Sequence, residues 1–227
     1  MMVAVPYLVI VVAMGYSRQS VAIGILMAGL AALSRNGLLL RFAAYVAVAA
    51  LFHKTAVVAF PLAALTGHRS PVVNVLLVGF IGFFLYDFFL EDSLAVFMRN
   101  YVEAEYSSQG ALIRVAMNLV PAALVLTMGR RLGFSDTERK LCRNFAIASF
   151  ELLVLLMVSP STTAVDRVAL YVLPAQIAVL SRVPGGLMRE LTGKLAVVAY
   201  SFAVQFVWLN FAANAGSWVP YRFFPLF

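Results

Sequence analysis

The sequence has little of three things that soluble proteins commonly use: charge, histidine and cysteine. Only 12% of the residues are charged, whereas 63% are hydrophobic and the mean hydropathy is +0.94. A soluble domain with that balance would lack the polar surface that meets water. The single cysteine, Cys142, excludes an internal disulfide and a cysteine-rich metal site. The shortage of charge therefore indicates an integral membrane protein.

The signatures of several common chemistries are missing as well. The chain has two histidines and no pair of carboxylates at the spacing of metal ligands. It contains neither a glycine-rich phosphate loop nor a serine-nucleophile motif. The N-terminus lacks the charged stretch and the A-x-A-like cleavage site of a signal peptide. We therefore predict no metal and no cofactor, and we expect the first residues to form a helix.

Apolar runs rich in Ala, Leu and Val take up most of the chain, and their continuity favours membrane helices. A straight span needs about 20 residues, so the runs 39–52 and 55–66 predict half-membrane helices unless their ends extend further. We predict an all-α, polytopic integral membrane protein with about nine transmembrane or half-membrane helices. The apolar runs are 1–14, 19–34, 39–52, 55–66, 71–90, 111–129, 144–158, 167–181 and 195–212.

Lysine and arginine predict how these helices are oriented. With the N-terminus in the cytoplasm, 11 of the 17 basic residues fall in cytoplasmic connections, where membrane proteins keep their positive excess. We therefore predict a cytoplasmic N-terminus and an extracytoplasmic C-terminus, and we assign the net positive charge to topology and not to nucleic acid binding. The predicted cytoplasmic residues are Arg35, Arg41, Arg69, Arg130, Arg131, Arg139, Lys140, Arg143, Arg182, Arg189 and Lys194.

The whole chain, residues 1–227, is predicted to be a single transmembrane domain, because no internal repeat and no soluble stretch of domain size is present. Three connections stand out in this arrangement. They are an extracytoplasmic loop at 91–110, a basic cytoplasmic loop at 130–143 and an extracytoplasmic tail at 213–227.

Polar residues that interrupt the apolar runs collect on the predicted outer side. The segment Gly15-Tyr16-Ser17-Arg18-Gln19 breaks a run that otherwise continues from Met1 to Leu33. An arginine at membrane depth costs about 2.5–3.5 kcal/mol on insertion scales, so it is usually kept for a task. The same side receives His53-Lys54, Asp166-Arg167 and Tyr221-Arg222. Four separate parts of the chain thus each bring a cation and a polar neighbour to one side.

Each of these residues also has a structural interpretation. Arg18 fits a side chain that snorkels to the headgroups, and His53-Lys54 fits a polar turn between helices. Asp166-Arg167 fits a helix start, and Tyr221-Arg222 fits an interfacial belt. Glu151, inside an apolar run, must be protonated or paired. The segments that contain Arg18, His53-Lys54, Asp166-Arg167 and Tyr221-Arg222 all fall on the predicted outer side, and this convergence favours a functional site there.

Arginine and lysine at a membrane surface suit an anionic ligand, above all phosphate. Guanidinium groups make bidentate contacts with phosphate oxygens and stay charged at physiological pH. The same groups would stabilise the charge that develops on a departing pyrophosphate. A titratable neighbour such as His53 or Asp166 would take the proton from an attacking hydroxyl.

Two stretches carry a resemblance to a known family. Gly15-Tyr16-Ser17-Arg18-Gln19 continues to Ala22 in the pattern G-x-x-R-Q-x-x-A, and Leu51-Phe52-His53-Lys54-Thr55-Ala56 follows the pattern L-F-H-K/S-[ST]-A. With these motifs the chain resembles the EpsG family of Wzy-like exopolysaccharide polymerases. Looser matches are Asp166-Arg167 with Tyr171, and Val219 to Arg222. Proteins of that family usually carry several more spans before the R-Q segment, so we expect this chain to correspond to their C-terminal portion.

The resemblance implies a GT-C-like polymerase in the bacterial cytoplasmic (inner) membrane. Such a protein would transfer a growing glycan from undecaprenyl pyrophosphate to the next lipid-linked repeat unit at the outer face. Its expected partners are the undecaprenyl-pyrophosphate-linked oligosaccharide, membrane lipids and other polysaccharide assembly proteins, with no nucleic acid. The alternatives are a lipid-glycan transporter or flippase, and a non-catalytic component of a polysaccharide export machine. The expected catalytic residues are His53 and Asp166, and the expected substrate-binding residues are Arg18, Gln19, Lys54, Arg167, Tyr221 and Arg222.

Overall fold

The computed structural model describes residues 1–64, 66, 71–90, 108, 110–159, 161–212 and 216. Every named element in this part of the chain is a helix, which confirms the predicted all-α membrane protein. Five helices are long and apolar enough to cross a membrane, or six if the bent pair Thr162–Ala169 and Pro174–Leu180 forms one span. The predicted number of about nine is not confirmed, because the remaining apolar helices are too short.

The elements follow the predicted apolar runs in order, with η1 a π-helix and η2 and η4 short 3₁₀ helices. They are η1 (Val5–Ala13), α1 (Ser17–Asn36), α2 (Leu39–Phe52), η2 (Lys54–Val58), α3 (Ala59–Ala64), α4 (Pro71–Phe89), α6 (Ala111–Met128), η4 (Gly129–Leu132), α7 (Asp136–Val158), α8 (Thr162–Ala169), α9 (Pro174–Leu180), α10 (Val183–Gly186) and α11 (Glu190–Phe211). The predicted loop 91–110 and tail 213–227 lie outside the described residues, apart from Ser108, Gly110 and Gly216.

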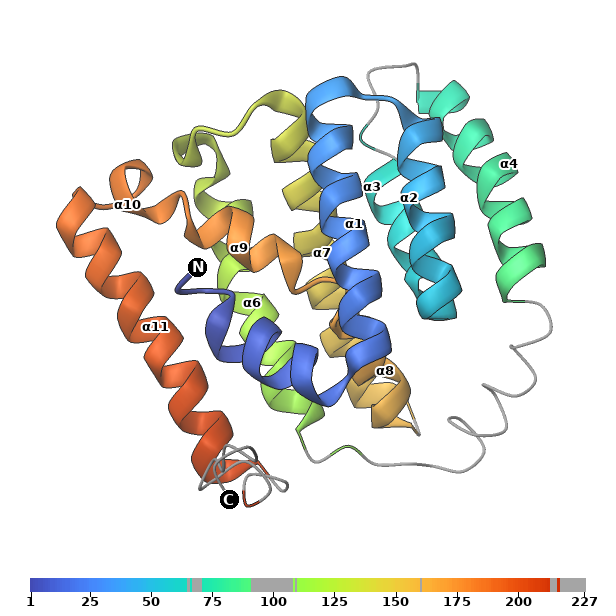
Figure 1. The fold of residues 1–227 in the computed structure, drawn as a ribbon. Coiled ribbons are helices and arrows are strands. Elements are labelled where there is room, and N and C mark those ends of the chain that lie inside the picture. The colour runs from blue at the N-terminus through green and yellow to red at the C-terminus, as the bar shows by residue number, and fades with distance from the viewer. Residues whose placement is uncertain are drawn as a thin grey trace, which may run out of the picture.

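Successive helices run up and down the bundle, so their connections gather at two ends (Figure 1). One end holds the η1–α1 and α2–η2 connections together with α8, and we refer to it as the α8 end. The opposite end holds the α1–α2 turn, the α6–α7 connection and α10, and we refer to it as the α10 end. The N-terminus lies between the two ends in Figure 1. Segment 1–14 therefore does not cross the full height of the bundle.

Single residues with non-helical backbones make the breaks at the α8 end. Tyr16 precedes α1 with φ −131° and ψ 57°, and His53 separates α2 from η2 with an extended backbone, φ −150° and ψ 107°. Between α8 and α9 the helix bends by 48°, just before Pro174 at the first position of α9. Pro174 lacks a backbone N–H and so cannot continue the hydrogen bonding of the preceding turn, although Leu173 before it keeps a helical backbone, φ −50° and ψ −37°. The predicted segments Gly15–Gln19 and His53-Lys54 therefore coincide with real interruptions of the helices, whereas Asp166-Arg167 lies inside α8.

Helix α7 begins earlier than the apolar run 144–158 indicates. Ser135 accepts a hydrogen bond from the backbone N–H of Glu138, and the Glu138 side chain accepts one from the backbone N–H of Ser135. This reciprocal capping box satisfies two backbone donors at the helix start. The second half of the predicted basic loop 130–143 is consequently helical, and Arg139, Lys140 and Arg143 project from the first turns of α7.

The core joins the two halves of the chain. Tyr7, Val11 and Val12 of η1 are buried in the same cluster as residues of α1, α2, α6 and α7. Helices α1 and α2 approach closely at Gly29, where an added Cβ would lie 2.7 Å from the Cβ of Tyr45. At Gly24, on the same helix, an added Cβ would meet nothing within 4 Å. Gly29 therefore permits the α1–α2 contact, whereas Gly24 faces open space.

These two glycines give a stability prediction with opposite signs. Gly29→Ala is expected to lower the melting temperature, because its methyl group overlaps Tyr45 and forces α1 away from α2. Gly24→Ala is the matched control and is expected to leave stability unchanged or raise it, since alanine in a helix gains about 0.5–1 kcal/mol over glycine. Thermal unfolding of both variants in detergent measures the difference. Equal melting temperatures for the two variants would contradict the close packing at Gly29.

Candidate functional site

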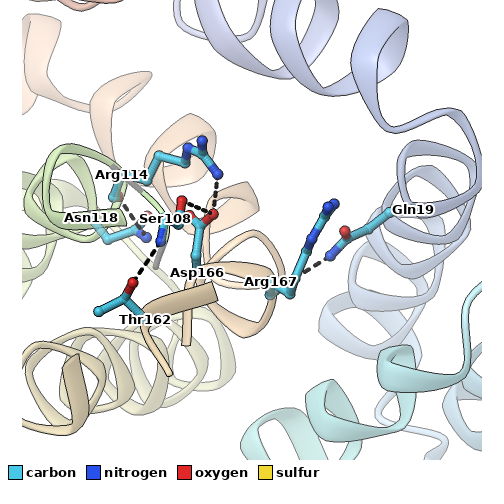
Figure 2. Close-up of polar contacts among 7 residues, drawn as sticks. All are labelled: Gln19, Ser108, Arg114, Asn118, Thr162, Asp166 and Arg167. Carbon is cyan, nitrogen blue, oxygen red and sulfur yellow. Dashed lines mark hydrogen bonds and ion pairs between the residues drawn. The ribbon is translucent and has the colours of Figure 1, made fainter. Parts of the chain in front are cut away.

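The α8 end brings three of the four predicted polar segments together. Gln19, in the first turn of α1, donates a hydrogen bond from Nε2 to the backbone carbonyl of Arg167 in α8 at 2.8 Å (Figure 2). Gln19 is 1% exposed, so it is a buried link between the start of α1 and the end of α8. The fourth segment, Tyr221-Arg222, lies outside the described residues.

His53 lies in a triangle of polar atoms that the sequence did not predict. Its Nδ1 is 2.7 Å from Oγ1 of Thr55 and 2.9 Å from the hydroxyl of Tyr171, and Thr55 donates to Tyr171 at 3.1 Å. Two tautomers fit this triangle. With its proton on Nδ1, His53 donates to Thr55 and leaves Nε2 as an acceptor; with its proton on Nε2, it accepts from Tyr171 at Nδ1. In both, the two hydroxyls fix the orientation of the ring.

The environment of His53 favours a neutral imidazole. Burial, and then the positive charges of Arg167 and Arg18, lower the pKa of His53 below its usual value of 6.5. Both effects disfavour the imidazolium form. A histidine held neutral at physiological pH has a nitrogen free to accept a proton. The charges of Arg167 and Arg18 therefore act on His53, which lies with them at the α8 end.

Arg167 and Arg18 present their charges differently. The guanidinium of Arg167 lies over the ring of Tyr16 at 4.3 Å from its centroid, and the residue is half-buried. Stacking of this kind fixes the guanidinium plane. Arg18 is exposed in the first turn of α1, and Lys54 is exposed at the start of η2. One oriented and two accessible cations therefore lie in the segments that surround His53.

Asp166 is placed differently from the other predicted residues. It is 2% exposed and forms an ion pair with Arg114 of α6, and its Oδ2 also accepts a hydrogen bond from Oγ of Ser108 at 3.1 Å (Figure 2). The backbone N–H of Ser108 in turn donates to Oγ1 of Thr162 at 2.7 Å. This arrangement favours an anchoring role for Asp166, which holds α8 against the start of α6. Proton transfer by Asp166 stays a prediction.

Arg114, Tyr7 and Tyr171 belong to this region, and none of the three was among the predicted site residues, although Tyr171 stands in one of the looser motif matches. Arg114 could have been predicted from the sequence, because it is a charged residue inside the apolar run 111–129 and the argument that singled out Arg18 applies to it equally. The hydroxyl of Tyr7 is buried without a hydrogen-bond partner, and the charges that act on it include those of Arg114, Asp166 and Arg167. Nothing in the local sequence of η1 distinguishes Tyr7 from an apolar core residue.

A chain of amides continues from this cluster into the bundle. Asn118, one turn beyond Arg114 on α6, donates to the carbonyl of Ala169 at 3.3 Å and accepts from Nε2 of Gln176 at 2.9 Å. The hydroxyl of Tyr200 on α11 donates to the carbonyl of Met117 at 2.9 Å. Polar groups at membrane depth need such partners, because lipid offers none. These bonds join α6, α8, α9 and α11 inside the bundle, next to the cluster around Asp166.

Titratable side chains do not cluster as metal ligands in the described part of the chain: no three His, Cys, Asp or Glu residues lie together there. The fold and this site define a polytopic helical membrane protein in which Arg18, Lys54 and Arg167 lie with a hydrogen-bonded histidine, His53, at the α8 end of the bundle. The EpsG family model matches residues 1–223, so the chain belongs to the EpsG family. It is therefore an exopolysaccharide polymerase-like membrane protein. Searches of curated proteins and of solved structures find no match to the chain.

Proposed function

We propose that this protein is a polysaccharide polymerase that acts on lipid-linked repeat units. In this proposal it transfers a growing glycan from undecaprenyl pyrophosphate to the next lipid-linked unit, at the outer face of the bacterial cytoplasmic membrane. The observation that carries the proposal is the placement of Arg18 and Arg167 near a neutral His53 that two hydroxyls orient. Membership of the EpsG family supports the same class of reaction.

The reaction needs one proton acceptor and stabilisation of one leaving group. The oxygen of an acceptor hydroxyl attacks the anomeric carbon of the growing glycan, and the bond from that carbon to the pyrophosphate oxygen breaks. The electron pair of this bond leaves with the lipid pyrophosphate, and the hydroxyl proton passes to Nε2 of His53. The tautomer in which Nδ1 donates to Thr55 leaves Nε2 free for this step.

The cations then stabilise the charge of the departing pyrophosphate. We assign Arg167 to the leaving group, because its guanidinium is held by the ring of Tyr16 and presents a planar fork to phosphate oxygens. Arg18 and Lys54 are exposed and suit initial binding of the lipid-linked substrates. Gln19 positions the end of α8 through its bond to the Arg167 carbonyl. Tyr221 and Arg222 stay in the proposal as further substrate-binding residues.

The proposed orientation places the α8 end outside the cytoplasm. Basic residues predominate in the connections at the α10 end, such as Arg130 and Arg131 in η4 and Arg189 before α11. Positive connections of membrane proteins are usually cytoplasmic. The site cations would then face the compartment in which lipid-linked repeat units are joined.

A reconstituted assay tests the proposal. Purified protein in liposomes is given a radiolabelled lipid-linked repeat unit, and longer lipid-linked chains are expected to form. His53→Gln is the matched variant, because it keeps a polar side chain of similar size but has no group that takes up a proton near neutral pH. Elongation by the parent that is lost in His53→Gln supports the polymerase. Movement of the labelled lipid across the liposome without elongation would contradict it and would support a transporter.

A further inference from the structure

A groove with two different halves runs from the end of α6 along the outer surface of α7. Its first half lies at the α10 end and encloses about 600 Å³. Its second half follows α7, with Leu126 as its one residue from α6, and is a shallow, open hollow of about 570 Å³. Leu126 lines both halves, and Arg143 and Ile147 lie one helical turn apart on α7, one in each half. The two hollows therefore form one continuous surface groove, which we call the α6–α7 groove.

The half at the α10 end is strongly cationic. Half of its lining residues are basic: Arg130, Arg131, Arg139, Lys140 and Arg143. Arg139 pairs with the exposed Asp136, and among the described residues the other four have no ion pair. The remaining lining residues, which include Val125 and Met128, belong to the end of α6 and its connection to η4. Unneutralised cations above an apolar floor favour a ligand with an anionic group joined to an apolar one.

The other half of the groove is apolar. It is lined by Leu126, Ile147, Phe150, Val154, Leu155 and Val158, with Glu151 as its one ionisable residue. From Arg143 to Val154 the helix rises by about 16 Å, close to half of a hydrocarbon core about 30 Å thick. The apolar half thus matches the depth of one leaflet. A carboxyl at Glu151 disfavours an anionic group there, so the groove accepts such a group only at its cationic half.

We propose that the α6–α7 groove binds an anionic phospholipid from the leaflet at the α10 end. The lipid phosphate lies among Arg130, Arg131 and Arg143, and an acyl chain lies along Ile147 and Val154. Basic residues near helix ends ordinarily act on topology alone and require no hollow. Here they line a hollow that opens into an apolar groove of leaflet depth, and that combination matches the two parts of a phospholipid. The site lies at the opposite end of the bundle from His53 and does not depend on the proposed polymerase activity.

A lipid titration tests the phosphate half of the groove. Purified, delipidated protein in detergent is titrated with phosphatidylglycerol, with phosphatidylcholine or with inorganic phosphate, and its melting temperature is followed. Phosphatidylglycerol is expected to raise the melting temperature at concentrations at which the other two have no effect. The double variant Arg131→Gln with Arg143→Gln is expected to weaken this response at least tenfold in lipid concentration. Arg35→Gln with Arg189→Gln, two cations at the same end but outside the groove, is the matched control and keeps the parent response.

A bulky substitution tests the acyl-chain half without a change of charge. Ile147→Trp fills the apolar groove and is expected to weaken the response to phosphatidylglycerol as strongly as the loss of the two arginines. Val198→Trp on α11 is the control, since the two positions are similarly exposed, 44% for Ile147 and 40% for Val198. An equal response to both lipids, or to phosphate alone, would overturn the proposal. So would a photo-crosslinker at position 147 that labels another protein and not phosphatidylglycerol.

Discussion

Replacing Arg167 with alanine is expected to lower the rate of glycan elongation by about 100-fold or more, the scale on which loss of one transition-state charge stabiliser acts. The loss arises at the departing pyrophosphate, which no longer faces the guanidinium held over Tyr16. Folding is expected to persist, because Gln19 donates to the backbone carbonyl of Arg167, which alanine retains. Arg167→Lys keeps the charge but loses the planar fork, so an intermediate rate is expected.

The matched control for this prediction is Arg182→Ala at the α10 end. Arg182 also lies over an aromatic ring, 5.2 Å from the centroid of Phe134, and it pairs with Glu138. Its removal costs a comparable stacking contact but touches no residue of the site. Melting temperatures and initial elongation rates are measured for both variants in the reconstituted assay. If both variants lose elongation to the same extent, the effect is one of stability and Arg167 has no special role.

Loss of the Arg167 charge has a second readout in the pH dependence of the elongation rate. Arg167 is one of the two cations that lower the pKa of His53, next in importance to burial. Arg167→Gln removes one of these charges, so the pKa of His53 rises toward its usual value. The imidazole is then protonated, and unable to accept a proton, up to a higher pH than in the parent. The acid limb of the pH–rate profile is expected to move to higher pH, and an unchanged limb would show that His53 is not the base.

The local breaks in the helices were predictable because each depends on a few neighbouring residues. Gly15 to Gln19 and His53-Lys54 are polar inside apolar runs, and a helix that meets them in a membrane must end or turn. The early start of α7 had a readable signal too, in the capping pattern from Ser135 to Glu138. The basic composition of 130–143 obscured it, because a charged stretch between apolar runs is usually counted as a loop.

The contacts that build the site were not predictable from spacing. His53 and Tyr171 are 118 positions apart, and Gln19 and Arg167 are 148 positions apart. No local pattern records which helices will pack side by side. The distribution of lysine and arginine along the chain predicted that the segments around Gln19, His53 and Asp166 lie on one side of the membrane. It did not indicate that Thr55 and Tyr171 orient His53, or that Asp166 faces Arg114.

Breaking the ion pair between Asp166 and Arg114 is expected to produce the largest loss of stability. The side chains are 3% and 15% exposed, so Asp166→Ala leaves a guanidinium in a largely buried position without its counter-ion. Removing one partner of such a pair typically costs about 3–5 kcal/mol. The double variant Asp166→Leu with Arg114→Met removes both charges and fills similar volume, and it is expected to recover more than half of the lost stability. Thermal unfolding in detergent measures Asp166→Ala, Arg114→Met and the double variant.

Stability and elongation together then decide what Asp166 does. The exposed pair of Glu190 and Lys194 is the control, because Glu190→Ala at a solvated site is expected to leave the melting temperature unchanged. If the double variant refolds and elongates glycan, the pair serves only to hold α8 against α6. If it refolds and does not elongate, a charge of this pair acts on the substrate or on the orientation of Arg167. Equal losses in the double and the two single variants would contradict the coupling between Asp166 and Arg114, since independent sites show no recovery.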